Sequence, residues 1–205
     1  MSGVTIQKIP YGGWKNCVQI TNGIVDLIVT VDVGPRIIRY GFTGQDNEMC
    51  EVSSTMGLTG GDEWRIYGGH RLWHSPEARQ RTYEPDNNPV KWENILNGIK
   101  TIQEVEPRAK IKKEMEISLL PQSTRVRVIH RLYNSGLWPL ELSVWSISAM
   151  APGGKEVIPQ TRKDTGLLPN RIMSLWPYAR LNDPRVYWGD KYIILQQDQD
   201  RKSVV

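Results

Sequence analysis

Turn-forming residues divide this chain into short segments, several of which alternate between apolar and polar side chains. In residues 125–133, three aliphatic residues and His130 fall on one face and three arginines on the other. A period of two is typical of a β-strand with one buried face. Asn22-Gly23 marks a tight hairpin turn, and Gly and Pro end most other segments. We predict strands at residues 4–9, 17–21, 24–33, 36–40, 49–52, 90–93, 98–104, 113–119, 125–133, 140–150, 155–159 and 191–197.

This pattern predicts an all-β fold built from antiparallel strands. The sequence contains no long amphipathic helix and no internal repeat. Residues 161–185 have turn residues at short intervals, so we expect an irregular excursion with at most one helical turn near residues 172–175. A chain of 205 residues can form one large β domain. We therefore expect a single β-sandwich domain over residues 1–205.

Charge and cysteine content exclude several classes of protein. The 26 basic and 22 acidic residues give a net charge of only +4, and glutamates are interleaved with the basic residues at 104–131. No nucleic-acid-binding motif is present, so we expect no nucleic-acid partner. No apolar run could cross a membrane, and the first residues do not resemble a secretion signal, which predicts a cytoplasmic protein without a membrane partner. Cys17 and Cys50 form no CxxC pair and are expected to be buried thiols.

The stretch from Tyr67 to Val90 concentrates the residues that can carry chemistry. It contains two of the three histidines, together with carboxylates, arginines, aromatic residues and an amide. Its glycines and prolines predict loops rather than a long regular element. Loops on a rigid scaffold often carry function. The same letters also occur in a packed corner between strands, with His70 satisfying only backbone groups.

A metal site is one interpretation of this stretch, because His70 and His74 are four residues apart with Glu77 beyond. The flanking glycines and proline disfavour the helix that this spacing needs, and Arg71 would place a cation beside the metal. We therefore predict no metal and no cofactor. The chain has no Gly-x-Ser-x-Gly, phosphate-binding loop or dinucleotide motif, so the sequence does not favour a hydrolase, a nucleoside triphosphatase or a dehydrogenase.

A polar site for a neutral ligand fits the residue types better. Histidine exchanges protons near neutral pH, and a carboxylate can act as its opposing partner. Arg71 and Asn87 present donors suited to hydroxyl and ring oxygens. The chain has eight Trp and eight Tyr but one Phe, and rings with a polar edge suit a sugar.

These residues resemble an uncharacterised branch of the galactose mutarotase-like (aldose 1-epimerase-like) superfamily. The branch is recognised by Gly-Gly-His-Arg-Leu-Trp, here residues 68–73, then Pro-Glu at 76–77 and Tyr-x-Pro-Asp-Asn-x-Pro-Val, matched at 83–90 with Asn87 directly before Asn88. Further matches lie at residues 33–38, 134–139, 151–154 and 158–160. The resemblance covers roughly residues 4–198. It implies an antiparallel β-supersandwich that holds a sugar in a cleft on one sheet.

The chain departs from the enzymes of that superfamily at two points. Those enzymes carry an acid histidine on a strand that the resemblance matches to residues 143–147, where this chain has Trp145. They take a glutamate base from a strand near the C-terminus, whereas this chain ends at Val205 just after a predicted strand. The resemblance therefore implies a truncated relative with an unpaired sheet edge, through which we expect a homodimer.

We predict a carbohydrate-binding protein of the aldose epimerase-like type, with interconversion of sugar anomers as an accompanying activity. His70 would be the proton donor and Glu77 or Asp86 the base, while His130 is a core or cleft-wall residue. The remaining predicted ligand contacts are Arg36, Arg71, Trp73, His74, Tyr83, Asn87 and Trp145. The alternatives are a sugar-binding or sensing protein without turnover and an inactive truncated relative.

Overall fold

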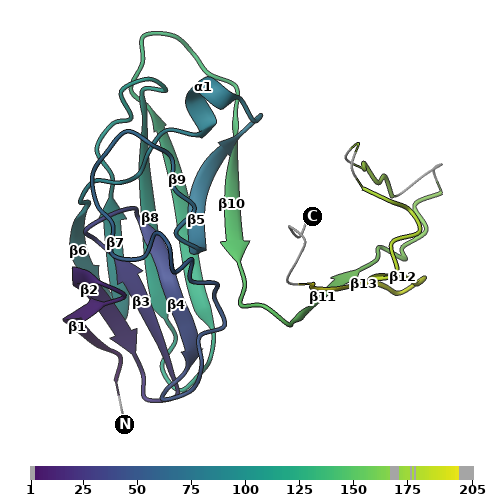
Figure 1. Cartoon of the computed structure of the whole chain (residues 1–205), viewed down its shortest axis with the longest axis horizontal. Coiled ribbons are helices and arrows are strands. Elements are labelled where there is room, and N and C mark those ends of the chain that lie inside the picture. Colours follow the sequence, from purple (N-terminus) through teal and green to yellow (C-terminus); the bar gives the residue numbers. More distant parts are fainter. Residues whose placement is uncertain (1–2, 167–170, 176, 178, 199–205) are drawn as a thin grey trace. The chain divides into compact units, whose positions relative to one another are not determined.

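The structure is a computed structural model that describes residues 3–166, 171–175, 177 and 179–198. It consists of strands joined by turns, with one short helix in the described ranges (Figure 1). The predicted all-β class and its antiparallel pairing are confirmed. The chain forms two compact units, Met1–Met150 and Ala151–Val205.

The first unit contains a six-stranded sheet in the order β1-β2-β3-β4-β5-β10. Consecutive strands pair as hairpins, and β10 pairs in antiparallel register with β5, placing Trp145 opposite Trp73 and Ser148 opposite His70. Its strands are β1 (Thr5–Tyr11), β2 (Trp14–Thr21), β3 (Val25–Thr30), β4 (Arg36–Phe42), β5 (Gly69–Ser75) and β10 (Ser143–Ala149).

A four-stranded sheet, in the order β6-β7-β8-β9, packs against the first sheet (Figure 1). Its strands are β6 (Lys91–Ile95), β7 (Gly98–Ile102), β8 (Ile111–Leu119) and β9 (Val126–Asn134). Aliphatic residues from both sheets form one buried cluster that includes Ile20, Leu72, Met115 and Ile117. This cluster makes the unit a β-sandwich, because each sheet buries one face against the other. As predicted, β9 turns Val128 and its same-face neighbours towards this core.

The outer face of the six-stranded sheet is covered by loops. A second buried cluster, which includes Trp14, Ile28, Ile38 and Tyr67, lies on that face and also packs against Met56. The loops come from residues 43–68 and 76–90, the latter containing the helix α1 (Arg79–Thr82). The six-stranded sheet is therefore buried on both faces over its central strands.

The sequence predicted a loop over Tyr67–Val90, but residues 69–75 of it form a strand. The glycines before this strand had suggested a loop. Gly68 and Gly69 both have positive φ angles, as has Tyr67 before them. A Cβ atom at Gly68 would overlap the carbonyl of Cys50, and one at Gly69 would overlap the carbonyl of Ile37. The glycines thus permit close approach of three chain segments, after which residues 69–75 continue as β5. Residues 76–90 form the predicted irregular segment apart from α1.

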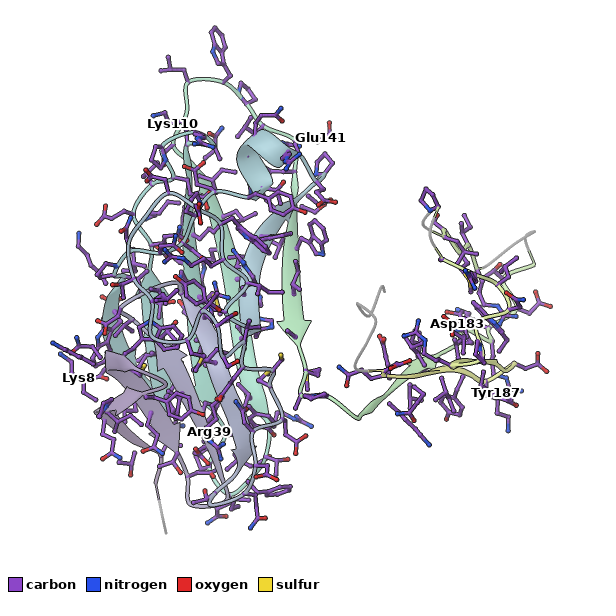
Figure 2. All side chains as sticks on the ribbon, viewed as in Figure 1. Lys8, Arg39, Lys110, Glu141, Asp183 and Tyr187 are labelled. Atoms are coloured by element: carbon purple, nitrogen blue, oxygen red, sulfur yellow. The ribbon has the colours of Figure 1, made fainter. Side chains whose placement is uncertain are left out.

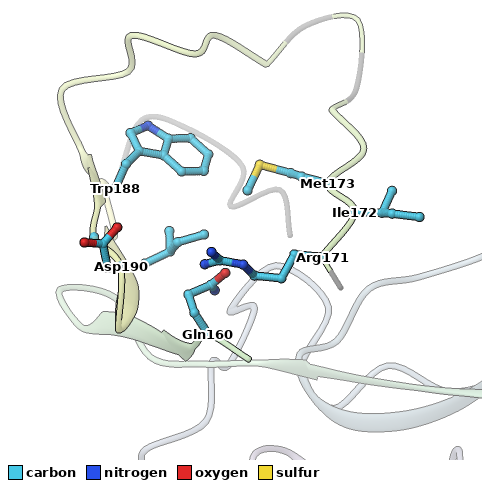
Figure 3. A pocket seen from close by; sticks show the side chains of 8 residues that line it. Gln160, Arg171, Ile172, Met173, Trp188 and Asp190 are labelled. Carbon is cyan, nitrogen blue, oxygen red and sulfur yellow. The ribbon is translucent and has the colours of Figure 1, made fainter. Parts of the chain in front are cut away.

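The second unit contains a three-stranded antiparallel sheet in the order β11-β13-β12. The strands β11 (Lys155–Pro159) and β13 (Tyr192–Gln196) match predicted strands, whereas the short β12 (Val186–Trp188) was not predicted. Residues 171–175 form no helical turn. A shallow pocket of about 290 Å³ lies beside this sheet, between Trp188 and the segment that carries Arg171 and Met173 (Figure 3).

Candidate functional site

Three of the predicted site residues form a buried ion cluster on the outer face of the six-stranded sheet. Arg36 on β4 and Arg71 on β5 occupy opposite positions in the strand register. One carboxylate oxygen of Asp86, Oδ2, accepts hydrogen bonds from both guanidinium groups, at 2.7 Å from Arg36 and 3.1 Å from Arg71. The three residues are 0%, 5% and 8% exposed, respectively. These charges are therefore paired with one another and shielded from solvent.

The charge states in this cluster follow from the pairing. Burial alone would raise the pKa of Asp86, but Arg71, Arg36 and Lys113 outweigh it and hold the pKa below its usual value. Burial lowers the pKa of Arg71 to about 10, partly opposed by Asp86, so Arg71 stays protonated at neutral pH. Asp86 is thus an ionised partner for two cations. It is poorly placed to act as the predicted base, because it is buried, committed to two ion pairs and weakly basic.

Asn87 also has a structural role next to this cluster. Its Oδ1 accepts a hydrogen bond of 2.8 Å from the hydroxyl of Tyr67, and its Nδ2 donates to the carbonyls of Gly61 and Glu63. Asn87 is fully buried. The guanidinium group of Arg36 lies 4.8 Å from the centre of the Tyr67 ring and donates to two backbone carbonyls. Arg36 and Asn87 therefore fasten the covering loops to the sheet.

An aromatic cluster lies beside the ion cluster on the same face. Trp73 is at its centre, with ring centroids 5.0 Å from Tyr83, 5.4 Å from Trp145 and 5.9 Å from Trp64. Trp73 is only 6% exposed, whereas the other three rings are partly exposed. The indole N–H groups of Trp64 and Trp73 are buried and find no acceptor in the described part of the chain. The cluster thus combines accessible ring surface with two unused donors.

Glu77 supplies a carboxylate at the edge of this aromatic cluster. Its side chain is exposed and accepts a short hydrogen bond from the hydroxyl of Tyr83. This hydrogen bond, together with burial, raises the pKa of the Tyr83 hydroxyl. The guanidinium group of Arg71 lies 4.8 Å from the centre of the Trp73 ring, so the ion cluster and the aromatic cluster are in contact. Of the three predicted catalytic residues, Glu77 is the only one on this accessible rim.

His70 lies on the opposite face of β5, towards the other sheet. Its Nδ1 is 2.8 Å from the hydroxyl of Ser148 on β10, and its Nε2 is 2.9 Å from Nε2 of His130 on β9. Burial, reinforced by His130, lowers the pKa of His70 to about 4, and burial also lowers that of His130. His70 is therefore neutral at pH 7. Because successive side chains of a strand point to opposite faces, His70 lies on the other face of β5 from Arg71 and Trp73.

His74 is buried within the sandwich rather than in a ligand site. It is fully buried, and neither ring nitrogen has a hydrogen-bond partner in the residues that the structure describes. Burial, with smaller contributions from Lys113 and Arg81, lowers its pKa to about 4. Lys113 is itself buried and forms an ion pair with the buried Glu106.

The structure therefore divides the ten predicted site residues into separate groups. Arg36, Arg71, Asp86 and Asn87 hold the loops on the outer face; Trp73, Tyr83, Glu77 and Trp145 form the aromatic rim; His70 and His74 face the sandwich interior. Sequence reasoning missed Trp64, Ser148, Lys113 and Glu106. The sequence could have indicated Lys113, because strand alternation places it on the same buried face as Ile111 and Met115. A charged side chain on that face needs a buried partner.

Among the residues that the structure describes, no group of three or more His, Cys, Asp or Glu side chains is arranged to hold a metal ion. The described ranges contain no helix that is long and apolar enough to span a lipid bilayer. Comparisons of the chain with protein-family models, with curated proteins and with solved structures found no match.

Proposed function

We propose that this protein binds a sugar on the aromatic rim formed by Trp64, Trp73, Tyr83 and Trp145, next to Glu77. The observation that supports this most directly is the group of partly exposed rings beside one exposed carboxylate. A sugar ring has apolar C–H faces that pack on aromatic rings and hydroxyl groups that need hydrogen-bond partners at the ring edge. The motif resemblance points to the same ligand class and to a galactose mutarotase-like supersandwich.

The polar groups on the rim suit hydroxyl ligands. The carboxylate of Glu77 can accept hydrogen bonds from two neighbouring hydroxyl groups, because each of its oxygens has free lone pairs. The indole N–H groups of Trp64 and Trp73 lack acceptors in the described part of the chain but are closed to solvent, so the carboxylate of Glu77 is the polar group that a ligand on the rim would meet. Arg36 and Arg71 are already paired with Asp86, so they are less available to a ligand.

The arrangement favours binding without interconversion of anomers. Ring opening needs an acid and a base on the same sugar. His70, the predicted acid, lies on the opposite face of β5 from Trp73, and Asp86 is paired with two arginines. Only Glu77 remains as a candidate proton acceptor at the rim. We therefore favour the binding or sensing alternative, and mutarotase activity stays a prediction that the experiment below tests separately.

Saturation-transfer NMR with a panel of free aldoses and sugar phosphates tests the proposal, with exchange spectroscopy on the same samples. We expect saturation transfer to at least one sugar without accelerated anomer exchange. Accelerated exchange would restore the mutarotase prediction. Absence of saturation transfer to every sugar, with a folded protein, would refute sugar binding.

The variant Trp145→Ala locates the binding site. We expect it to weaken affinity about fivefold, because one aromatic contact contributes about 1 kcal/mol. Trp138→Ala is the matched control: Trp138 is 77% exposed and lies on a loop outside the aromatic cluster. Glu77→Gln keeps the size of the side chain and should also weaken binding. Equal effects of the Trp138 and Trp145 variants would place the ligand elsewhere.

We also propose that the predicted homodimer forms through β10. Of the four edge strands of the sandwich, β1 carries Lys8 and Pro10 with an irregular register, β6 carries Lys91 and Glu93, and β9 carries two arginines (Figure 2 labels Lys8). The strand β10 contains no charge and no proline. Such an edge has no protection against pairing with a second copy. Ile147→Lys should reduce the dimer fraction in light scattering; an unchanged dimer, or a wild-type monomer, would contradict this assignment.

A further inference from the structure

Ser148, His70 and His130 form a continuous hydrogen-bonded row from three different strands. Ser148 belongs to β10 and His70 to β5, which are paired in the six-stranded sheet, and His130 belongs to β9 of the four-stranded sheet (Figure 1). The hydroxyl of Ser148 is 2.8 Å from Nδ1 of His70, whose Nε2 is 2.9 Å from Nε2 of His130. We propose that these three residues are a nucleophilic triad that hydrolyses carboxylic esters with short acyl groups.

The positions of the protons follow from the two contacts. Only one of the two facing Nε2 atoms can carry a hydrogen if the contact is a hydrogen bond between neutral rings. When Ser148 donates to Nδ1 of His70, the hydrogen of His70 lies on Nε2 and is donated to Nε2 of His130. This is the arrangement of a nucleophile, a base and an orienting acceptor, with His130 in the place often taken by a carboxylate.

The nucleophile is accessible, and its strand offers a donor for a developing negative charge. Ser148 is exposed at the last strand of the six-stranded sheet. The carbonyl of the next residue, Ala149, accepts from Cys50, whose own carbonyl accepts from Gly69 of β5. Neighbouring residues of a strand direct their backbone groups to opposite sides. The backbone N–H of Ser148 therefore points to the unpaired edge of β10. It can stabilise an oxyanion there in the monomer, whereas the homodimer proposed above would occupy it.

The base is in the form that the reaction needs. The titratable group facing His70 is His130 on β9, and Ser148 faces it from β10. With its pKa lowered to about 4 by burial and by His130, His70 is neutral and can accept a proton at pH 7. Such an imidazole is a weak base, so we expect slow turnover that is best seen with activated esters.

The proposed reaction proceeds by acyl transfer. Ser148 Oγ attacks the ester carbonyl carbon, and its proton moves to Nδ1 of His70 while Nε2–H stays bonded to His130. The C–O bond to the alcohol breaks, and His70 returns the proton to the departing alcohol oxygen. Water then attacks the acyl group on Ser148, again with His70 as base, which releases the carboxylic acid and restores the hydroxyl. Val128 and Leu132, on either side of His130 on the same face of β9, are half-buried and suit a short aliphatic acyl chain.

This triad is independent of the sugar proposal, because it lies on the other face of β5 and β10. The purified full chain is treated with a fluorophosphonate probe, and hydrolysis of p-nitrophenyl acetate and butyrate is followed in parallel. We expect labelling at Ser148 and at least a hundredfold loss of enzyme-dependent hydrolysis in Ser148→Ala. Ser146→Ala is the matched control, since Ser146 is exposed on the same face of β10. No labelling, or equal hydrolysis by the two variants, would overturn the proposal.

His130 is a positioning residue in this scheme, and its test uses the pH profile. The wild-type rate should hold down to about pH 5 and fall as His70 becomes protonated near pH 4. His130→Ala removes a group that lowers the pKa of His70, so the acidic fall should move to higher pH and the plateau rate should drop about tenfold or more. His130→Gln, which keeps an acceptor, should recover part of the rate. A drop in rate with an unshifted profile in both variants would contradict the proposed role.

Discussion

The two faces of β5 use neighbouring residues of one motif for different purposes. On the outer face, Arg71 and Trp73 join an ion cluster and an aromatic cluster beneath loops. On the inner face, His70 bonds to a serine and a second histidine, and His74 is buried without a partner. The outer polar groups are paired by charge, whereas the inner imidazoles are kept neutral by burial. Residues adjacent in sequence thus belong to two chemical environments separated by one sheet.

The largest expected effect comes from removing the shared anion of the outer face. Asp86→Ala leaves Arg36 and Arg71 buried without a counter-charge, so we expect a loss of about 3–5 kcal/mol in the free energy of unfolding. Urea unfolding followed by tryptophan fluorescence measures this loss. Glu104→Ala is the control, because the ion pair of Glu104 with Lys91 is exposed and its removal should leave the midpoint unchanged. A similar urea midpoint for both variants would show that Asp86 does not stabilise the fold by neutralising Arg36 and Arg71.

A smaller, pH-dependent effect is expected on the inner face. The pKa of His74 is about 4 in the folded protein and near 6.5 in an unfolded chain, so the unfolded chain binds more protons between these values. The stability that the neutral imidazole permits is complete above pH 6.5 and is lost as pH falls towards 4. His74→Leu should change stability little at pH 7.5 and make the protein more stable than wild type at pH 5. Urea midpoints at both pH values measure this difference. An equal loss of stability in wild type and His74→Leu between pH 7.5 and pH 5 would contradict the prediction.

The smallest effect is expected at the aromatic rim. Tyr83→Phe removes the hydrogen bond to the exposed Glu77 but keeps the ring. The free energy of unfolding should therefore change by less than about 1 kcal/mol. Sugar affinity, measured by NMR titration, should fall more clearly because Glu77 loses the hydroxyl that positions it. A large loss of stability would instead assign the rim to the structural part of the outer face.

Much of the fold could be predicted because the strands and hairpins here have local sequence patterns, namely alternating apolar and polar residues and turn-forming dipeptides. Period two identified β9 and its inward face, and Asn22-Gly23 correctly placed a hairpin between β2 and β3. The signal failed for β12, which has three residues, and for β5, whose flanking glycines and proline suggested a loop. Taking β5 for a loop had a direct consequence. The histidines and Arg71 were placed in one site, although a strand directs them to opposite sides.

The site was harder to predict, because its contacts join residues far apart in the chain. His70 meets His130 and Ser148, which are 60 and 78 residues away. Residue types indicated that Arg36 and Asp86 matter, but not that each would satisfy the other. Glu77 and Trp145 were expected near a ligand, and their place on the accessible rim leaves that prediction open to test.

Gly68 and Gly69 also bear on how relatives of this protein could be recognised. They stand where β4, β5 and the segment around Cys50 cross, and any larger residue would push these backbones apart. Selection acting on that crossing would retain both glycines independently of any ligand. The glycine pair is therefore a marker of this architecture, whereas residues 77 and 145, whose side chains are exposed or half-exposed, are free of that backbone constraint.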